Sequence, residues 1–262
     1  MDEVLDLRDV GVRRGSTWIL RSVRWVVREG ERWVVLGPNG AGKSTLLSIA
    51  SARLHPTEGS VEILGERLGR TDTAELKTRI GLVGAVTADA IPARETVRDA
   101  VVTAAHGITG RWRETYDEAD LARADLLLGR LGIDGLRDRR FGTLSEGERK
   151  RAQIARALMP DPELCLLDEP AAGLDLGARE DLIATLTQMA ADPRSPATVL
   201  VTHHVEEIPP GTTHALLLRG GGVVEAGPVG DVLRDEPVSQ AYGRPIRVQL
   251  VGERFVAQAA PG

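Results

Sequence analysis

One nine-residue segment constrains the fold of this chain more than any other. Residues 37–45 read GPNGAGKST, between a continuous apolar run, Trp33-Val-Val-Leu36, and an apolar-faced segment that begins at Leu46. The segment fits G-x-x-x-x-G-K-[ST] at the junction of a buried strand and a helix. Its glycines let the backbone curl so that successive N–H groups and the helix N-terminus face a polyphosphate. The chain therefore has to contain an α/β unit that presents this loop.

The side chains of this loop are the first candidate site. Lys43 would place a point charge between β- and γ-phosphates, and the Ser44 hydroxyl would ligate Mg²⁺. Only three of the 33 basic residues are lysines, which indicates that arginine could not replace Lys43. The predicted phosphate-binding residues are Gly37, Pro38, Asn39, Gly40, Ala41, Gly42, Lys43, Ser44 and Thr45.

A second candidate site ends another apolar run, Leu164-Cys-Leu-Leu-Asp-Glu169. Open α/β sheets place their ligands at the carboxyl ends of strands. Asp168 is a predicted metal ligand for Mg²⁺, directly or through water, and Glu169 would orient or deprotonate an attacking water. An acidic pair alone is ordinarily a solvated turn, but beside a phosphate loop it points to hydrolysis.

Three further motifs follow the same order as in a known family. Leu144-Ser-Glu-Gly-Glu148 is similar to the signature LSGGQ, Ala172-Gly-Leu-Asp175 to the D-loop, and Thr202-His203 to the switch histidine. Together with the phosphate loop and the acidic strand end, they cover residues 37–203. The chain resembles the nucleotide-binding subunit of an ATP-binding cassette (ABC) protein.

The resemblance implies a composite site. Residues 37–45 would bind ATP with Mg²⁺, Glu169 and His203 would be catalytic, and His203 would touch the γ-phosphate. Two cassettes would sandwich two ATP molecules, so a chain with one cassette would work as a homodimer or as a heterodimer with a related chain. The residues expected to act in trans across the dimer are Ser145, Gly147, Glu148 and Asp175.

The hydrophobic pattern predicts an α/β fold: a P-loop NTPase, RecA-like core with an N-terminal antiparallel β lobe and an inserted helical lobe. Apolar residues alternate from Val4 to Val27, as in half-buried strands. Thr115 and Glu118 match a capping box, which predicts a helix start there. We expect one ABC ATPase domain over residues 1–262, with approximately 1–30 and 55–80 as the β lobe, 31–54 and 158–235 as the P-loop core, 86–157 as the helical lobe with the signature, and 236–262 as a C-terminal β appendage.

Three positions depart from the family pattern. Ala85 stands where a glutamine usually contacts Mg²⁺ and senses the membrane partner. At the adenine platform an aromatic is usual, and here Arg14 aligns with it, with Trp18 nearby; either could stack on a purine. Glu146 and Glu148 replace Gly and Gln in the signature, and their charges would have to be screened or turned away from a γ-phosphate.

Composition limits the partners and the location. The chain has 262 residues and a net charge of −5, so no overall positive field exists to bind nucleic acid. No apolar stretch approaches the roughly 20 residues of a membrane span, and the N-terminus is acidic where a signal peptide is basic. We expect a cytoplasmic protein, peripheral on the inner face of the cell membrane when bound to a permease.

Two functions stay open at this point. The first is an ATPase subunit that powers transport through a membrane permease on separate chains; its C-terminal extension is similar to that of iron-complex and molybdenum-type importer ATPases. The alternative is a soluble, non-transport ABC ATPase with a regulatory or repair role, which Ala85 favours. The transported substrate and the direction of transport cannot be read from the sequence.

Overall fold

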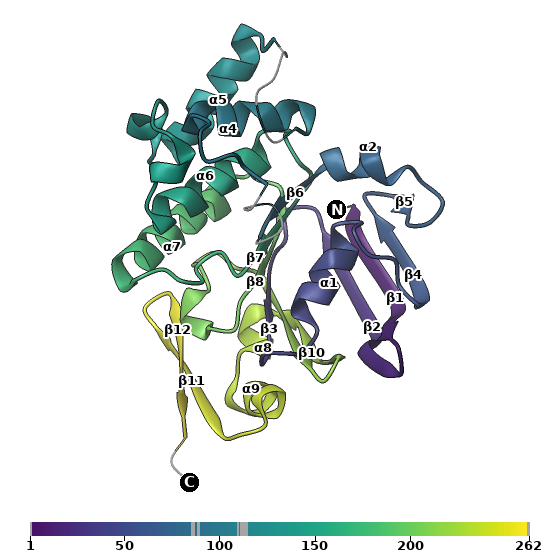
Figure 1. Cartoon of the computed structure of the whole chain (residues 1–262). Coiled ribbons are helices and arrows are strands. Elements are labelled where there is room, and N and C mark those ends of the chain that lie inside the picture. The colour runs from purple at the N-terminus through teal and green to yellow at the C-terminus, as the bar shows by residue number, and fades with distance from the viewer. Residues whose placement is uncertain (1, 85–86, 88–89, 109, 111–114, 261–262) are drawn as a thin grey trace.

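The computed structural model describes residues 2–84, 87, 90–108, 110 and 115–260. Three sheets and a group of helices make up the architecture (Figure 1). The expected α/β class and the P-loop NTPase core are confirmed, whereas the lobe boundaries given above stay a prediction. Position Ala85, the departure singled out in the sequence, lies outside the described residues.

A six-stranded sheet forms the centre of the molecule. Its order is β10-β9-β3-β8-β7-β6; β9, β3, β8, β7 and β6 run parallel, and β10 is antiparallel to β9. The strands are β3 (Arg32–Leu36), β6 (Ile80–Val83), β7 (Leu164–Asp168), β8 (Ala197–Val201), β9 (His214–Arg219) and β10 (Gly222–Pro228). Because neighbouring strands are parallel, their carboxyl ends lie on the same side of the sheet, and the segments that follow β3, β7 and β8 meet there.

The continuous apolar runs of this sheet reflect burial on both faces. In β3, Val34 and Leu36 belong to one hydrophobic cluster, and Trp33 and Val35 belong to the other. This division follows from the period-2 alternation of side chains along a strand. The sheet therefore has a packed core on each side, which makes its strand ends a rigid support for a site.

An antiparallel sheet and α1 cover one face. The sheet has the order β2-β1-β4-β5, and its strands are β1 (Glu3–Arg14), β2 (Thr17–Arg28), β4 (Glu58–Ile63) and β5 (Glu66–Arg67). Helices α1 (Lys43–Ala50) and α2 (Thr73–Thr78) lie in the same part of the molecule (Figure 1). The alternating pattern read from the sequence is the buried face of β1 and β2.

Helices from residue 97 onward pack on the other face. They are α4 (Val97–Val102), α5 (Glu118–Arg130), α6 (Glu146–Leu158) and α7 (Leu176–Ala191), with short 3₁₀ turns η1 (Thr103–His106), η2 (Asp134–Leu136), η3 (Phe141–Thr143) and η4 (Val205–Glu207). The expected start of α5 was wrong in its cap. Asp117, not Thr115, is the N-cap, because its carboxylate accepts from the Asp120 N–H at 2.8 Å.

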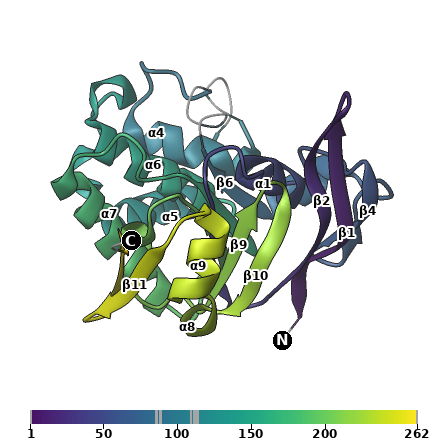
Figure 2. The same ribbon diagram turned by 90° about the horizontal axis from the view of Figure 1, so that it is seen from below.

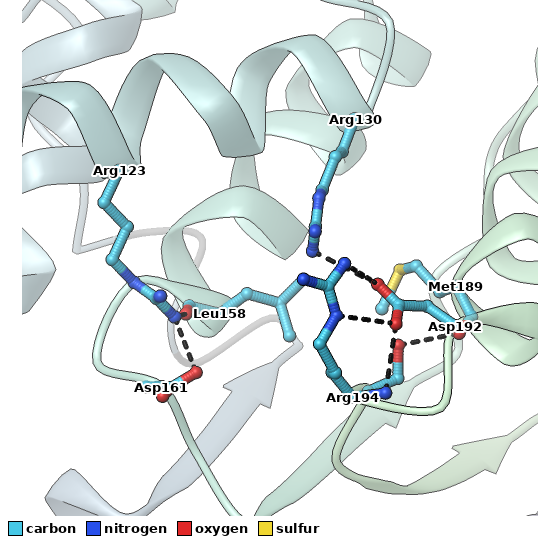
Figure 3. Close-up of polar contacts among 8 residues, drawn as sticks. Arg123, Arg130, Leu158, Asp161, Met189, Asp192 and Arg194 are labelled. Carbon is cyan, nitrogen blue, oxygen red and sulfur yellow. Dashed lines mark hydrogen bonds and ion pairs between the residues drawn. The ribbon is translucent and has the colours of Figure 1, made fainter.

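Arginines on α5 bind this helix to the loops behind α6 and α7. The Arg123 guanidinium donates to the carbonyls of Leu158 and Met159 at 2.9 and 2.8 Å and pairs with Asp161 at 2.8 Å. Arg130 lies 3.5 Å from Asp192, which also binds Arg194 (Figure 3). Charged hydrogen bonds to carbonyls at a helix end are among the stronger polar contacts.

The chain ends in two short helices and a hairpin. These are α8 (Val229–Val232), α9 (Asp235–Tyr242), β11 (Ile246–Val251) and β12 (Arg254–Ala259). The expected β hairpin is confirmed, with Val251 opposite Arg254 at the turn. Figure 2 shows α9 beside β9, with β11 beyond it, on the side of the molecule away from β1 and β2. In the part of the chain that the structure describes, every helix is too short or too polar for a membrane span.

Candidate functional site

The phosphate loop connects β3 to α1. Gly40 and Gly42 have φ angles of 79° and 105°, a backbone region that side chains other than glycine rarely adopt. At Gly37 a Cβ would lie 2.3 Å from the Leu218 carbonyl oxygen, so a side chain has no space there. Gly42 caps α1 without a side-chain bond, which leaves the first N–H groups of the helix directed at a ligand.

Lys43 is buried beneath the loop. Its ammonium donates to the carbonyl oxygens of Gly37 at 2.8 Å and of Pro38 at 3.2 Å. Burial lowers the pKa of Lys43, while the negative charges of Glu169 and Asp168 act against that decrease. An ammonium has three donors, so one remains for a phosphate oxygen.

Asp168 ends β7 and faces the start of α1. Burial raises the pKa of its carboxyl group, and the Glu169 charge adds to the rise; a hydrogen bond with Ser44 and the charges of Lys43 and Lys150 lower it. Among the described residues, one of its buried carboxylate oxygens has no hydrogen-bond partner. A hydroxyl beside a carboxylate with an unsatisfied oxygen is a donor set that Mg²⁺ accepts, so Ser44 and Asp168 fit the expected ion.

Glu169 and His203 come together from neighbouring strands. The Glu169 backbone N–H donates to the Val201 carbonyl at 2.9 Å, which connects the ends of β7 and β8. Glu169 has a φ of 47°, an uncommon conformation for a residue with a side chain, and such strain gathers at functional positions. Its Oε1 lies 3.3 Å from His203 Nδ1, and each side chain is 33% exposed. The pair is therefore open to solvent and to a substrate.

Buried polar contacts hold the loop that carries His203. Thr202 is fully buried, and its hydroxyl donates to the buried Glu207 carboxylate. His204 is exposed, and its ring lies 4.1 Å from that of His203. Sequence reasoning missed Glu207 and a further neighbour, Tyr242, whose hydroxyl donates to the His203 carbonyl at 3.2 Å.

The signature begins α6. Ser145 and Glu148 form a reciprocal capping box: Glu148 accepts from the Ser145 N–H at 2.7 Å, and the Ser145 hydroxyl accepts from the Glu148 N–H at 3.3 Å. Glu146 pairs with Arg149 at 3.3 Å and lies 4.0 Å from Lys150. Both carboxylates of the altered signature thus have partners at the start of their own helix. These contacts partly screen the charges that were expected from the sequence to repel a γ-phosphate.

Asp175 likewise has its hydrogen-bond partner at the start of its own helix. Its carboxylate accepts from the Ala178 N–H at 2.8 Å and caps α7. A Cβ on Gly147 would lie 3.0 Å from the Cβ of Ala178, so the starts of α6 and α7 are in contact. No hydrogen bond or ion pair among the described residues joins Ser145 or Asp175 to the phosphate loop. The in-trans role of Ser145, Gly147, Glu148 and Asp175 stays a prediction.

The adenine prediction falls on the β1–β2 hairpin. Arg14 is exposed and pairs with Thr17 at the hairpin end. The guanidinium over the Trp18 ring belongs to Arg13, at 5.7 Å from the ring centroid. The structure thus gives Trp18 a cationic neighbour other than the one expected, and an adenine contact of Arg14 or Trp18 stays a prediction.

The fold and this constellation define a P-loop NTPase. Residues 20–172 match the family described as ABC transporter. The chain is 40% identical over 260 residues to the uncharacterized ABC transporter ATP-binding protein YlmA of Bacillus subtilis strain 168, covering 98% of both chains. The chain belongs to the ABC transporter family and is an ATP-binding ATPase cassette.

Solved structures show the same architecture. The structure of cbiO1 from Clostridium perfringens, part of the ABC transporter complex cbiONQ, superimposes with a TM-score of 0.79 at 25% identity, covering 92% of this chain and 94% of that one. A dimer of the cassette MJ0796 in a post-hydrolysis state, bound to ADP and Pi, gives a TM-score of 0.73 at 25% identity, with coverages of 86% and 98%.

Proposed function

We propose that this chain is the ATP-hydrolysing subunit of a transporter, that it dimerises around two ATP molecules, and that it drives a membrane permease carried on separate chains. The observation that supports ATP hydrolysis is a cluster at the carboxyl ends of the parallel strands. It consists of Lys43, Asp168, Glu169 and His203. The chain would lie in the cytoplasm, at the membrane surface when bound to the permease.

Each of these groups has a defined part in hydrolysis. Lys43 and the loop N–H groups bind the β- and γ-phosphates. Ser44 and Asp168 would hold Mg²⁺, which neutralises phosphate charge when bound. Glu169 accepts a proton from the water that attacks the γ-phosphorus, and ADP leaves. His203, 3.3 Å from the same carboxylate, orients Glu169 and contacts the γ-phosphate.

The second half of each site would come from another cassette. Ser145 and Asp175 are exposed at adjacent helix starts, and Leu176 beside them is 67% exposed. An exposed leucine next to a helix N-terminus suits a surface that another protein covers. The dimer of MJ0796 supports this arrangement for cassettes of the same fold. The partner is a second copy of this chain or a related chain.

A groove between the sheet and α6 supports the proposal that the chain binds a membrane permease. It has a volume of about 380 Å³, and Lys77, Ile80, Ile91, Gln153 and Arg156 contribute to its lining. Gln153 is 3% exposed, and neither its amide nitrogen nor its amide oxygen has a partner among the described residues. A buried amide without partners costs free energy that an incoming polar backbone can recover. We assign this groove to a cytoplasmic segment of the permease.

Affinity capture tests the proposal. Glu169→Gln keeps the shape of the site but removes the base, so with ATP it should accumulate as a dimer by light scattering. The same variant, captured with ATP from detergent-solubilised membranes, should bring a protein with several membrane spans with it. Gln153→Ala in the Glu169→Gln background should lose that protein yet still dimerise, which separates the groove from the ATP site.

The alternative is an ABC ATPase without a permease, in regulation or repair. The alanine at position 85 favours it, because a methyl group cannot contact Mg²⁺ or sense a membrane partner. Capture of no multi-span protein, with an intact ATP-dependent dimer, would support this alternative. A Glu169→Gln protein that stays monomeric at millimolar ATP would contradict the sandwich mechanism itself.

A further inference from the structure

The C-terminal end of the chain packs against the loop that carries His203. Residues 235–259 contain α9 and the β11–β12 hairpin, and we call them the C-terminal strap. Figures 1 and 2 both place the hairpin on the side of the molecule where α7 lies. Strand β12 contacts η4, the turn that begins two residues after His203. The strap is thus in contact with the immediate continuation of a proposed catalytic residue.

Three hydrogen bonds join the strap to this loop. The Tyr242 hydroxyl donates to the His203 carbonyl at 3.2 Å. The Arg254 guanidinium donates to the Glu206 carbonyl, and the Ala257 N–H donates to the Glu206 carboxylate at 3.2 Å. The backbone is therefore bound at His203 and again three residues later.

Arg254 extends the connection to α7. Its guanidinium also pairs with Glu180 at 2.9 Å. Glu180 lies on α7 five residues after Asp175, which caps this helix and is expected at the cassette interface. One side chain thus joins the His203 loop to the helix that follows the D-loop.

Tyr242 lies between the His203 loop and the phosphate loop. Its hydroxyl interacts with the backbone of Gly37 as well as with the His203 carbonyl. The Tyr242 hydroxyl is a protonated donor at neutral pH, and burial, which raises its pKa to about 12, keeps it a donor in more alkaline solution as well. The same side chain therefore contacts both the His203 loop and the phosphate loop.

The position of the His203 ring depends on this backbone. The Thr202–Glu207 bond fixes the start of the loop in the core, and Val205 is buried after it. The carbonyl of His203 itself is held by the strap, at Tyr242. A displacement of about 1 Å in a reacting group can reduce turnover by up to 10²-fold.

We propose that the C-terminal strap positions the His203 loop for hydrolysis, with Tyr242 and Arg254 as positioning residues. This inference rests on the proposed catalytic roles of Glu169 and His203. It gives the C-terminal appendage, which carries no recognisable motif, a direct effect on turnover.

Steady-state ATPase kinetics of the full chain test it. Tyr242→Phe removes the hydroxyl and Arg254→Gln removes the charged fork, and each should lower kcat roughly 3- to 10-fold, the scale of one hydrogen bond. For Arg254→Gln, KM and the Kd of a fluorescent ATP analogue should not change, because the contacts of Arg254 are with Glu180 and Glu206. For Tyr242→Phe, whose hydroxyl also interacts with the Gly37 backbone, the fold loss in kcat should exceed any change in Kd, because the phosphate loop keeps its glycines and Lys43. Arg247→Ala is the matched control, since Arg247 is exposed on the same hairpin.

A double mutant separates positioning from general stability. In the His203→Ala background, Tyr242→Phe should cause no further loss of kcat, because the group that it positions is gone. Three results would refute the proposed role of the strap: an equal further loss of kcat in that background, an unchanged kcat in both single variants, or a loss confined to ATP affinity. If His203→Ala hydrolyses ATP at the full rate, the proposed function fails at His203. If only the Tyr242 and Arg254 variants do so, the strap alone fails.

Discussion

Replacing Asp168 by Asn should make the chain more stable while it abolishes hydrolysis. Burial and the Glu169 charge both raise the pKa of Asp168 above its ordinary value of 3.8, so its ionised form is unfavourable in the folded protein. One of its buried oxygens has no partner among the described residues, and an unsatisfied buried polar atom costs about 1–3 kcal/mol. Asparagine keeps an oxygen that can accept from Ser44, and its amide nitrogen takes the place of the other oxygen, so the gain comes from the removal of the desolvated charge.

We take the lower end, about 1 kcal/mol, because Asp168 is only partly buried. In a chain of this size that corresponds to a rise in Tm of about 2–4 °C at pH 8 without nucleotide. The direction of the pKa shift of Asp168 determines how the stability gain depends on pH. A raised pKa means that the wild type loses stability as pH rises through that pKa, so the gain from Asn should be largest at pH 8 and shrink toward pH 4.

Thermal unfolding of both proteins at several pH values measures the effect. Asp138→Asn is the control, because the Asp138 side chain is 88% exposed and its neutralisation should change stability by less than about 0.5 kcal/mol. A lower Tm for Asp168→Asn at pH 8, or a gain of the same size at pH 4, would refute the reasoning.

Three further predictions follow from the site and its surroundings. Lys43→Ala should abolish ATP binding, measured with a fluorescent nucleotide, and normal affinity would contradict the phosphate-loop assignment. Ala85→Gln should raise kcat in an ATPase assay if the missing side chain limits turnover; an unchanged rate would show that another group fills that role. Arg123→Met keeps most of the apolar stem of the side chain but loses the guanidinium contacts to two carbonyls and Asp161, so it should lower the free energy of unfolding in urea by about 1–3 kcal/mol. Arg123→Lys should lose part of that amount, and no change in either variant would show that these bonds contribute nothing.

The central strands were predictable because their pattern has one physical explanation. The run Trp33–Leu36 is apolar without alternation, and β3 is buried on both faces. Leu164–Leu167 and Val199–Val201 are of the same kind and lie in β7 and β8. Loops after parallel strands converge, so the meeting of Lys43 with Asp168 follows once these strands are assigned.

The wrong cap of α5 and the unexpected neighbour of Trp18 have equally local causes. At α5, Thr115 fits a cap motif, but Asp117 is as good a cap and lies next to the first helical residue. On β1, a shift in register between Val12 and Arg13 interrupts the pairing, and Arg13 rather than Arg14 is the residue over Trp18. A shift of one residue exchanges the two faces of a strand, and spacing alone cannot reveal it.

Tyr242 marks what a motif-based reading cannot reach. It contacts His203 across 39 residues of sequence, and its position depends on how α9 packs beside β9. The residues of the ATP site break local rules: Lys43 is buried, Asp168 keeps an unsatisfied oxygen, and Glu169 has a positive φ. Such features destabilise a fold and persist where surrounding packing imposes them. The two hydrophobic clusters supply that packing beneath the strand ends, and the strap supplies it at the His203 loop, where the sheet has already ended.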